Sequence, residues 1–140
     1  MDRENTKARA PLPAPGHCSE LEGRPRILLI EDDPALGEVM QELLELAGWT
    51  TVVALNGPSG VAKARSLHPE VVLCDLGLPG MDGYAVARAI RADEVLGGIR
   101  LVALSGSCWP EDAARALAAG FDHHLSKPPR MERLRQVVEA

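Results

Sequence analysis

Five short apolar runs divide the chain from residue 26 onward. They span residues 27–30, 51–55, 71–74, 99–104 and 123–126, and the last is the weakest. Four of the runs are continuous rather than alternating, which is typical of strands covered on both faces, as in a parallel sheet. The pattern therefore predicts five buried, parallel strands.

Helical periodicity fills the stretches between these runs. In the first stretch, Asp33 is a good N-cap and Pro34 a good first helical residue, and Gly48 is a typical helix end. Further helices are expected at residues 59–67, 83–91, 110–119 and 130–139. One apolar stripe is predicted for the first helix at Leu36, Val39, Met40, Leu43, Leu44 and Ala47.

Alternation of strand and helix predicts β-α-β units, which build a parallel sheet. Right-handed crossovers leave few arrangements for five such units. The expected fold is α/β: an open, doubly wound, five-stranded parallel sheet of (βα)5 type between two helical layers, as in flavodoxin-like three-layer sandwiches.

The first 24 residues differ from the remainder. They hold Pro11, Pro13 and Pro15 among charged and small residues, which is typical of a flexible tail or interdomain linker. The start lacks the apolar segment of a signal peptide, and no apolar run approaches the ~20 residues of a membrane helix. We expect a tail at residues 1–24 and one globular domain at residues 25–140, in the cytoplasm and without membrane insertion.

Composition restricts the partners. Aromatic residues make up only 3% of the chain, so the core must be aliphatic and stacking platforms for nucleic-acid bases are not expected. Lys and Arg number 15 against 20 Asp and Glu, and the formal charge of -5 disfavours direct binding to nucleic acid. The three cysteines lack the spacing of a disulfide framework, and Cys74 is expected to be a small buried hydrophobe.

Polar side chains follow four of the five apolar runs. Glu31 and Asp32 follow the first run, Asp75 the third, Ser105 the fourth and Lys127 the fifth. In an open parallel sheet the carboxyl ends of the strands meet at one edge, where ligands bind. These side chains are therefore expected to converge.

The converging groups predict a particular chemistry. Clustered carboxylates raise one another's pKa, and a hard divalent cation relieves that repulsion. Mg²⁺ takes oxygen ligands and usually combines one or two carboxylates with phosphate oxygens. Lys127 supplies a compact positive charge suited to a phosphate oxygen. The set therefore indicates a magnesium-dependent site for phosphoryl transfer.

These residues resemble the motifs of the response-regulator receiver domains of two-component signalling, a CheY-like family. Residues 27–33 are similar to the acidic-pair strand of that family, and residues 75–83 to its phosphoacceptor loop. Leu104-Ser105-Gly106 matches the hydroxyl position and Lys127-Pro128 the lysine–proline pair. The resemblance covers residues 25–140, with all motifs in the family's order.

The resemblance implies a role for each matched residue. Asp75 would be the phosphoacceptor, and Ser105 and Lys127 would contact the phosphoryl group. A cis peptide would join Lys127 to Pro128, as X–Pro bonds allow. The Mg²⁺ ligands would be Glu31 (through water), Asp32, Asp75 and the backbone carbonyl of Gly77.

The resemblance also implies a switch and partners. Ser105 would move toward the phosphate and free space for the residue at position 124, which is His here where receivers commonly carry Tyr or Phe. The output face would consist of the fourth helix, fifth strand and fifth helix, through which a homodimer is also expected. A histidine kinase or histidine phosphotransfer protein would donate the phosphoryl group, and a downstream protein would be the target.

Several interpretations compete. The leading one is a receiver with no output domain on this chain, which is not an enzyme beyond its own aspartyl phosphorylation and dephosphorylation. Its alternative is the terminal receiver of a hybrid sensor histidine kinase. An aspartate-nucleophile phosphatase would carry a second Asp where this chain has Gly77. The intact set of acids, hydroxyl and lysine disfavours a pseudo-receiver that only binds partners.

Overall fold

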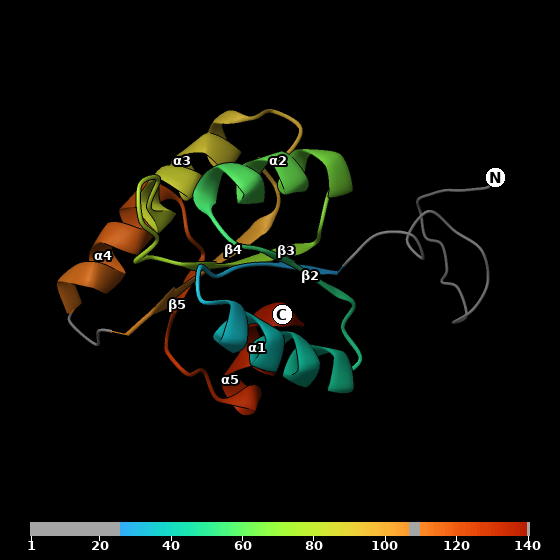
Figure 1. Cartoon of the computed structure of the whole chain (residues 1–140). Coiled ribbons are helices and arrows are strands. Elements are labelled where there is room, and N and C mark those ends of the chain that lie inside the picture. The colour runs from blue at the N-terminus through green and yellow to red at the C-terminus, as the bar shows by residue number, and fades with distance from the viewer. Residues whose placement is uncertain (1–25, 107–109, 140) are drawn as a thin grey trace.

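The computed structural model describes residues 26–106 and 110–139. The tail expected at residues 1–24 lies outside them. Strands and helices alternate along the whole described chain (Figure 1). The strands are β1 Ile27–Ile30, β2 Thr51–Ala54, β3 Val71–Asp75, β4 Arg100–Ser105 and β5 His123–Ser126. The helices are α1 Pro34–Leu46, α2 Gly57–Leu67, α3 Gly83–Ala92, α4 Pro110–Ala119 and α5 Met131–Val138.

The five strands form one parallel sheet in the order β2-β1-β3-β4-β5. Helices α1 and α5 cover one face, and α2, α3 and α4 cover the other (Figure 1). The strand order reverses next to β1, so the carboxyl ends of β1 and β3 flank the crevice where ligands bind in such sheets. The predicted doubly wound, three-layer α/β fold is confirmed.

The sheet separates two aliphatic cores. All four residues of β1 have no exposed surface, because helices cover both of its faces. Alternate residues of the strands point to opposite faces, so Leu28 and Ile30 belong to the core under α2, α3 and α4. Ile27 and Leu29 belong to the core under α1 and α5. Continuous apolar runs are therefore required in the central strands.

Helix α1 is less buried than its apolar stripe predicts. Met40 and Leu44 face the core, but Val39 and Leu43 are 52% and 47% exposed. Leu46, outside the predicted stripe, is 84% exposed. A helix lying on one side of a sheet buries only a narrow stripe of its surface. The six predicted positions span a wider stripe than the one that contacts the sheet.

Local capping sets several element boundaries. The side chain of Asn56 accepts a hydrogen bond from the amide of Ser59 at 2.7 Å, so α2 begins at Gly57, two residues before the predicted start. Asp75 closes β3 rather than following it. Among the described helices, none combines the length and apolarity needed to cross a membrane.

Arg91, near the end of α3, ties three segments together. Its Nε donates to the carbonyl of Gly120 at 2.8 Å. One terminal nitrogen donates to the carbonyls of Gly97 and Ile99 at 2.7 and 2.6 Å. The other pairs with Asp122 at 2.8 Å. A single guanidinium thus joins the end of α3, the loop before β4 and the turn before β5.

Candidate functional site

Strand β1 delivers two acidic residues to its carboxyl end. Glu31 follows directly after the buried strand and has only 1% of its surface exposed, whereas Asp32 is exposed. Asp33 has a separate role: its Oδ1 accepts hydrogen bonds of 3.0 and 3.4 Å from two amides in the first turn of α1. The prediction that Asp33 is the N-cap of this helix is confirmed.

Strand β3 delivers Asp75, its last residue, which is 7% exposed. The amide of Gly77 donates to Asp75 Oδ1 at 3.0 Å and so fixes the carboxylate at the start of the loop. The loop closes tightly on itself, because a Cβ at Gly83 would lie 2.7 Å from the carbonyl oxygen of Asp75. Glycine alone allows α3 to begin that close to the strand end. Asp82 caps α3 through the amide of Ala85 at 2.9 Å.

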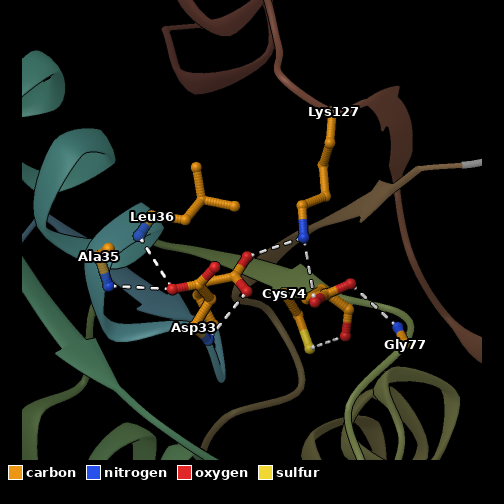
Figure 2. Close-up of polar contacts among 8 residues, drawn as sticks. Asp33, Ala35, Leu36, Cys74, Gly77 and Lys127 are labelled. Atoms are coloured by element: carbon orange, nitrogen blue, oxygen red, sulfur yellow. Dashed lines mark hydrogen bonds and ion pairs between the residues drawn. The ribbon is translucent and has the colours of Figure 1, made fainter.

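Lys127, in the loop after β5, reaches across to both carboxylates. Its Nζ lies 2.9 Å from Glu31 Oε1 and 3.1 Å from Asp75 Oδ2 (Figure 2). The backbone amide of Lys127 donates to the carbonyl of Ser105 at 2.8 Å, which holds the loop against the end of β4. The peptide bond from Lys127 to Pro128 is cis, as predicted.

Ser105 ends β4 at the same edge of the sheet. It is 7% exposed and follows Leu104, the residue that pairs with Asp75 in the neighbouring strand. Its own partner in β5 is Ser126, the residue before Lys127. The topology therefore places Ser105 between the strand that ends in Asp75 and the loop that carries Lys127.

The charges of this edge are unequal. Three carboxylates, those of Glu31, Asp32 and Asp75, stand against one ammonium, that of Lys127. Burial raises the pKa of Glu31 above its usual value, although the hydrogen bond from Lys127 acts in the opposite direction. Burial lowers the pKa of Lys127, but its hydrogen bonds to Glu31 and Asp75 outweigh that effect and hold the pKa above its usual value.

The carboxylates fit a small divalent cation. One oxygen from each of Glu31, Asp32 and Asp75 lies within 4.8 Å of the others. Two of the three side chains are buried, so their repulsion is poorly screened by water. Hard oxygen donors around an exposed opening suit Mg²⁺, which keeps several waters in its coordination shell.

For two other residues named from the sequence, Gly77 and His124, the structure gives the position but not the predicted role. Gly77 contributes its amide to Asp75, and the expected bond from its carbonyl to a metal stays a prediction. His124 is half-buried in β5 and pairs with Ala103. Within the described residues, its Nε2 atom is buried and has no hydrogen-bond partner.

One feature of the site was not predicted in this form, and one expectation beside it is confirmed. The sequence suggested Glu31 as a metal ligand acting through water, but its Oε1 is paired with Lys127. The signal was its position directly after a fully buried strand, where a lone carboxylate needs a partner. Cys74, expected to be a buried hydrophobe, has no exposed surface, and burial raises the pKa of its thiol far above the usual range.

This arrangement suits one class of chemistry. A carboxylate at the floor of an open acidic site, held by one amide and faced by one ammonium, can attack an electrophile that brings its own negative oxygens. A phosphoryl group is such an electrophile, because a bound cation and Lys127 would offset its charge.

Comparison with known proteins finds receiver domains. The family model for the response regulator receiver domain matches residues 27–139. The DNA-binding dual master transcriptional regulator RpaA of Synechocystis sp. is 35% identical over 116 residues, which cover 83% of this chain and 48% of RpaA. The DNA-binding response regulator MtrA of Mycolicibacterium smegmatis is 38% identical over 105 residues, which cover 75% of this chain and 45% of MtrA. The chain thus spans about half the length of these relatives.

Solved structures agree. The receiver domain of a sensor histidine kinase from Pseudomonas aeruginosa, crystallised with a magnesium ion coordinated in its active site cleft, superposes with a TM-score of 0.75 at 28% identity. The match covers 84% of this chain and 99% of that domain.

Proposed function

The chain belongs to the response-regulator receiver family, and on that premise we propose that it accepts a phosphoryl group on Asp75 and then changes conformation to regulate a partner protein. Receiver domains are signalling domains that act with histidine kinases and downstream effectors. The observation that carries the assignment is the position of Asp75, whose carboxylate faces Lys127 and lies beside Glu31 and Asp32 at the carboxyl edge of the sheet.

In the proposed reaction, a carboxylate oxygen of Asp75 attacks the phosphorus of a phosphohistidine on the donor. The new P–O bond forms as the P–N bond breaks, and the electron pair of that bond remains on the imidazole nitrogen, which takes a proton from water. Lys127 Nζ already lies 3.1 Å from Asp75 Oδ2, so it is placed to contact a phosphoryl oxygen. Positioning and charge neutralisation carry most of the catalysis in such transfers.

Mg²⁺, when bound, would supply the countercharge for the transferred oxygens. The proposed ligands are Glu31, through water, Asp32, Asp75 and the carbonyl of Gly77. The closeness of the three carboxylates supports this set. Lys127 balances only part of their charge, so these acids favour a divalent cation even before a phosphoryl group arrives.

The proposed switch runs through Ser105 and His124. Ser105 follows Leu104, the residue that pairs with Asp75. His124 lies two residues before Ser126, the residue of β5 that pairs with Ser105. The buried Nε2 of His124 has no partner among the described residues, so a new environment costs it no hydrogen bond there. The output face proposed is α4, β5 and α5. The sequence offers Trp109 as a cap of the core edge or a docking anchor, and Ser107 as a residue too small to cover Asp75. Both lie outside the described residues.

Three settings are proposed for the domain. The similarity to the receiver of a sensor histidine kinase favours a hybrid kinase, whereas the relatives named as DNA-binding response regulators favour a longer regulator. A role as a separate regulator acting by protein contact stands beside these. In each setting the donor is a histidine kinase or histidine phosphotransfer protein, and this domain itself is proposed not to bind nucleic acid.

The test is phosphorylation by a small-molecule phosphodonor such as acetyl phosphate in the presence of Mg²⁺. The intact mass should increase by one phosphoryl group in the wild type and in Asp112→Asn, which removes a carboxylate of α4 outside the cluster. Asp75→Asn should stay unmodified. Full labelling of Asp75→Asn would refute the assignment, and labelling without Mg²⁺ would refute the metal requirement.

A further inference from the structure

A groove of about 300 Å³ lies where β5 meets the start of α5. It is separate from the carboxylate cluster, although Ser126 and Pro128, the two neighbours of Lys127, belong to its wall. Pro128 and Pro129 form a stiff apolar side, since proline fixes its own backbone. The groove is lined by His124, Leu125, Ser126, Pro128, Pro129, Arg130 and Arg133.

The charge of this groove has one sign. Arg130 and Arg133 are exposed and stand three residues apart, so both guanidiniums lie on one side of α5. Within the described residues neither has a carboxylate partner, and the bond of Arg133 is to the neutral Gln136 at 2.6 Å. Glu132, the acid of this helical turn, is not part of the lining. The positive charge stands out on a chain whose net charge is -5.

The start of α5 adds to this charge. Its N-cap is Arg130, whose side chain cannot accept a hydrogen bond, and no side chain caps the helix. The first amides therefore face outward with the positive end of the helix dipole, which Glu132 offsets in part. This feature alone specifies no ligand, but it has the same sign as the two guanidiniums beside it.

From these observations we propose that the groove is a docking site for an acidic segment of the downstream protein, bearing carboxylates and an apolar residue. The carboxylates pair with Arg130 and Arg133, for which guanidinium geometry is well suited. The apolar residue lies against Pro128 and Pro129. Complementary charge of this kind selects partners and speeds association more than it adds affinity.

One feature of the docking site, its control by phosphorylation, rests on the proposed function. Lys127 holds Glu31 and Asp75 in the structure described. When Asp75 carries a phosphoryl group, Lys127 turns to that group, and the loop that forms the groove wall moves with it. The affinity for the acidic segment therefore changes on phosphorylation.

The probe is a fluorescein-labelled synthetic peptide of alternating glutamate pairs and leucines, and its control has glutamine in place of every glutamate. Binding is followed by fluorescence anisotropy at low ionic strength. The wild-type chain should bind the glutamate peptide more tightly than the glutamine peptide. The double variant Arg130→Gln, Arg133→Gln should lose roughly two- to fivefold in affinity for each guanidinium removed.

The matched control is Arg88→Gln with Arg135→Gln, which removes the same charge from exposed positions outside the groove. It should keep the wild-type affinity, and thermal unfolding should show that both double variants fold. Equal weakening in both pairs, no preference for the glutamate peptide, or no binding to the wild type would overturn the docking site.

Asp75→Asn separates this inference from the proposed function. In this variant the peptide affinity should not change when acetyl phosphate is added, whereas that of the wild type should. If the wild type takes up no phosphate while the arginine dependence holds, the proposed function fails and the docking site stands. If phosphate is taken up without arginine dependence, the reverse is true.

Discussion

Lys127 shows how one residue sets the resting state of the site. Its ammonium bridges Glu31 and Asp75 and so relieves the repulsion between two buried acids. The exposed Asp32 is left as the third acid. In this state the lysine occupies the side of Asp75 at which a phosphoryl oxygen would be stabilised. The proposed phosphorylation would therefore replace an existing ion pair rather than create the first one.

Gly77 lies two residues after Asp75, beside its carboxylate. It has no side chain to cover the carboxylate, and a Cβ there would meet only Asp75 Oδ1, at an ordinary 3.7 Å. Its φ lies outside the left-handed range, so a larger residue fits without strain. We expect Gly77→Met to lengthen the half-life of the phosphoform severalfold, because the side chain shields the acyl phosphate from water.

The decay is measured at saturating Mg²⁺ by loss of the added mass after removal of phosphodonor. Gly98→Met is the matched control, because a Cβ at Gly98 meets nothing within 4 Å and the residue lies at the opposite edge of the sheet. A half-life equal to or shorter than that of the wild type in Gly77→Met would contradict the shielding argument.

At the scale of elements, Arg91 joins the end of α3 to the segments that precede β4 and β5. Three carbonyls and one carboxylate accept hydrogen bonds from it. The carboxylate of Asp122 is 46% exposed, so that ion pair contributes little. The three carbonyls belong to partly buried loop residues, and Arg91 supplies each with a hydrogen-bond donor.

Arg91→Ala is expected to lower the free energy of unfolding by about 2–4 kcal/mol, because several hydrogen bonds from a charged donor and the packing of its stem are lost together. Arg88→Ala, on an exposed position of the same helix, should stay within about 0.5 kcal/mol of the wild type. Urea unfolding with equal m-values measures both. Indistinguishable midpoints for the two variants would show that the network has no such effect.

The sequence predicts the elements well where a local rule sets them. Asp33 and Pro34 define the start of α1, and the uninterrupted apolar runs define the central strands. The start of α2 was placed too late, because the helical pattern begins at Ser59 while Asn56 provides the cap. The burial of Val39 was overestimated, because periodicity gives the direction of a stripe and not the width of the contact.

The candidate site was predictable for a topological reason. A parallel sheet brings the ends of β1, β3 and β4 to one edge, so Glu31, Asp75 and Ser105 converge without knowledge of any distance. Which acid pairs with Lys127 depends on the path of the loop after β5, which the sequence does not specify. The contacts of Arg91 were missed because they join residues far apart in the chain.

At the scale of the whole molecule, the acidic edge couples stability to metal. A cation that binds the folded chain alone stabilises it by about 2.7 kcal/mol at a hundredfold excess over Kd, or roughly ten degrees in Tm. We therefore expect Mg²⁺ to raise Tm, and Asp32→Asn to weaken the effect. Differential scanning calorimetry with KCl at matched ionic strength is the measurement.

Addition of EDTA should return the Tm to the metal-free value in the wild type. A rise of equal size in KCl would show that screening, and not a bound ion, is responsible. The same rise in Asp32→Asn as in the wild type would remove Asp32 from the ligands.

The strand order also divides the site into a part where amide hydrogens should exchange slowly and a part where they should exchange faster. Glu31 follows β1 and Asp75 ends β3, and both of these strands have partners on both sides. Lys127 follows β5, a rim strand joined to β4 alone. Amide hydrogens of inner strands exchange only in large openings, and those of a rim strand exchange in small ones. A detachment of β5 would withdraw the ammonium of Lys127 while Glu31 and Asp75 keep their places. The molecule can therefore lose and regain its own countercharge many times within the lifetime of one folded state.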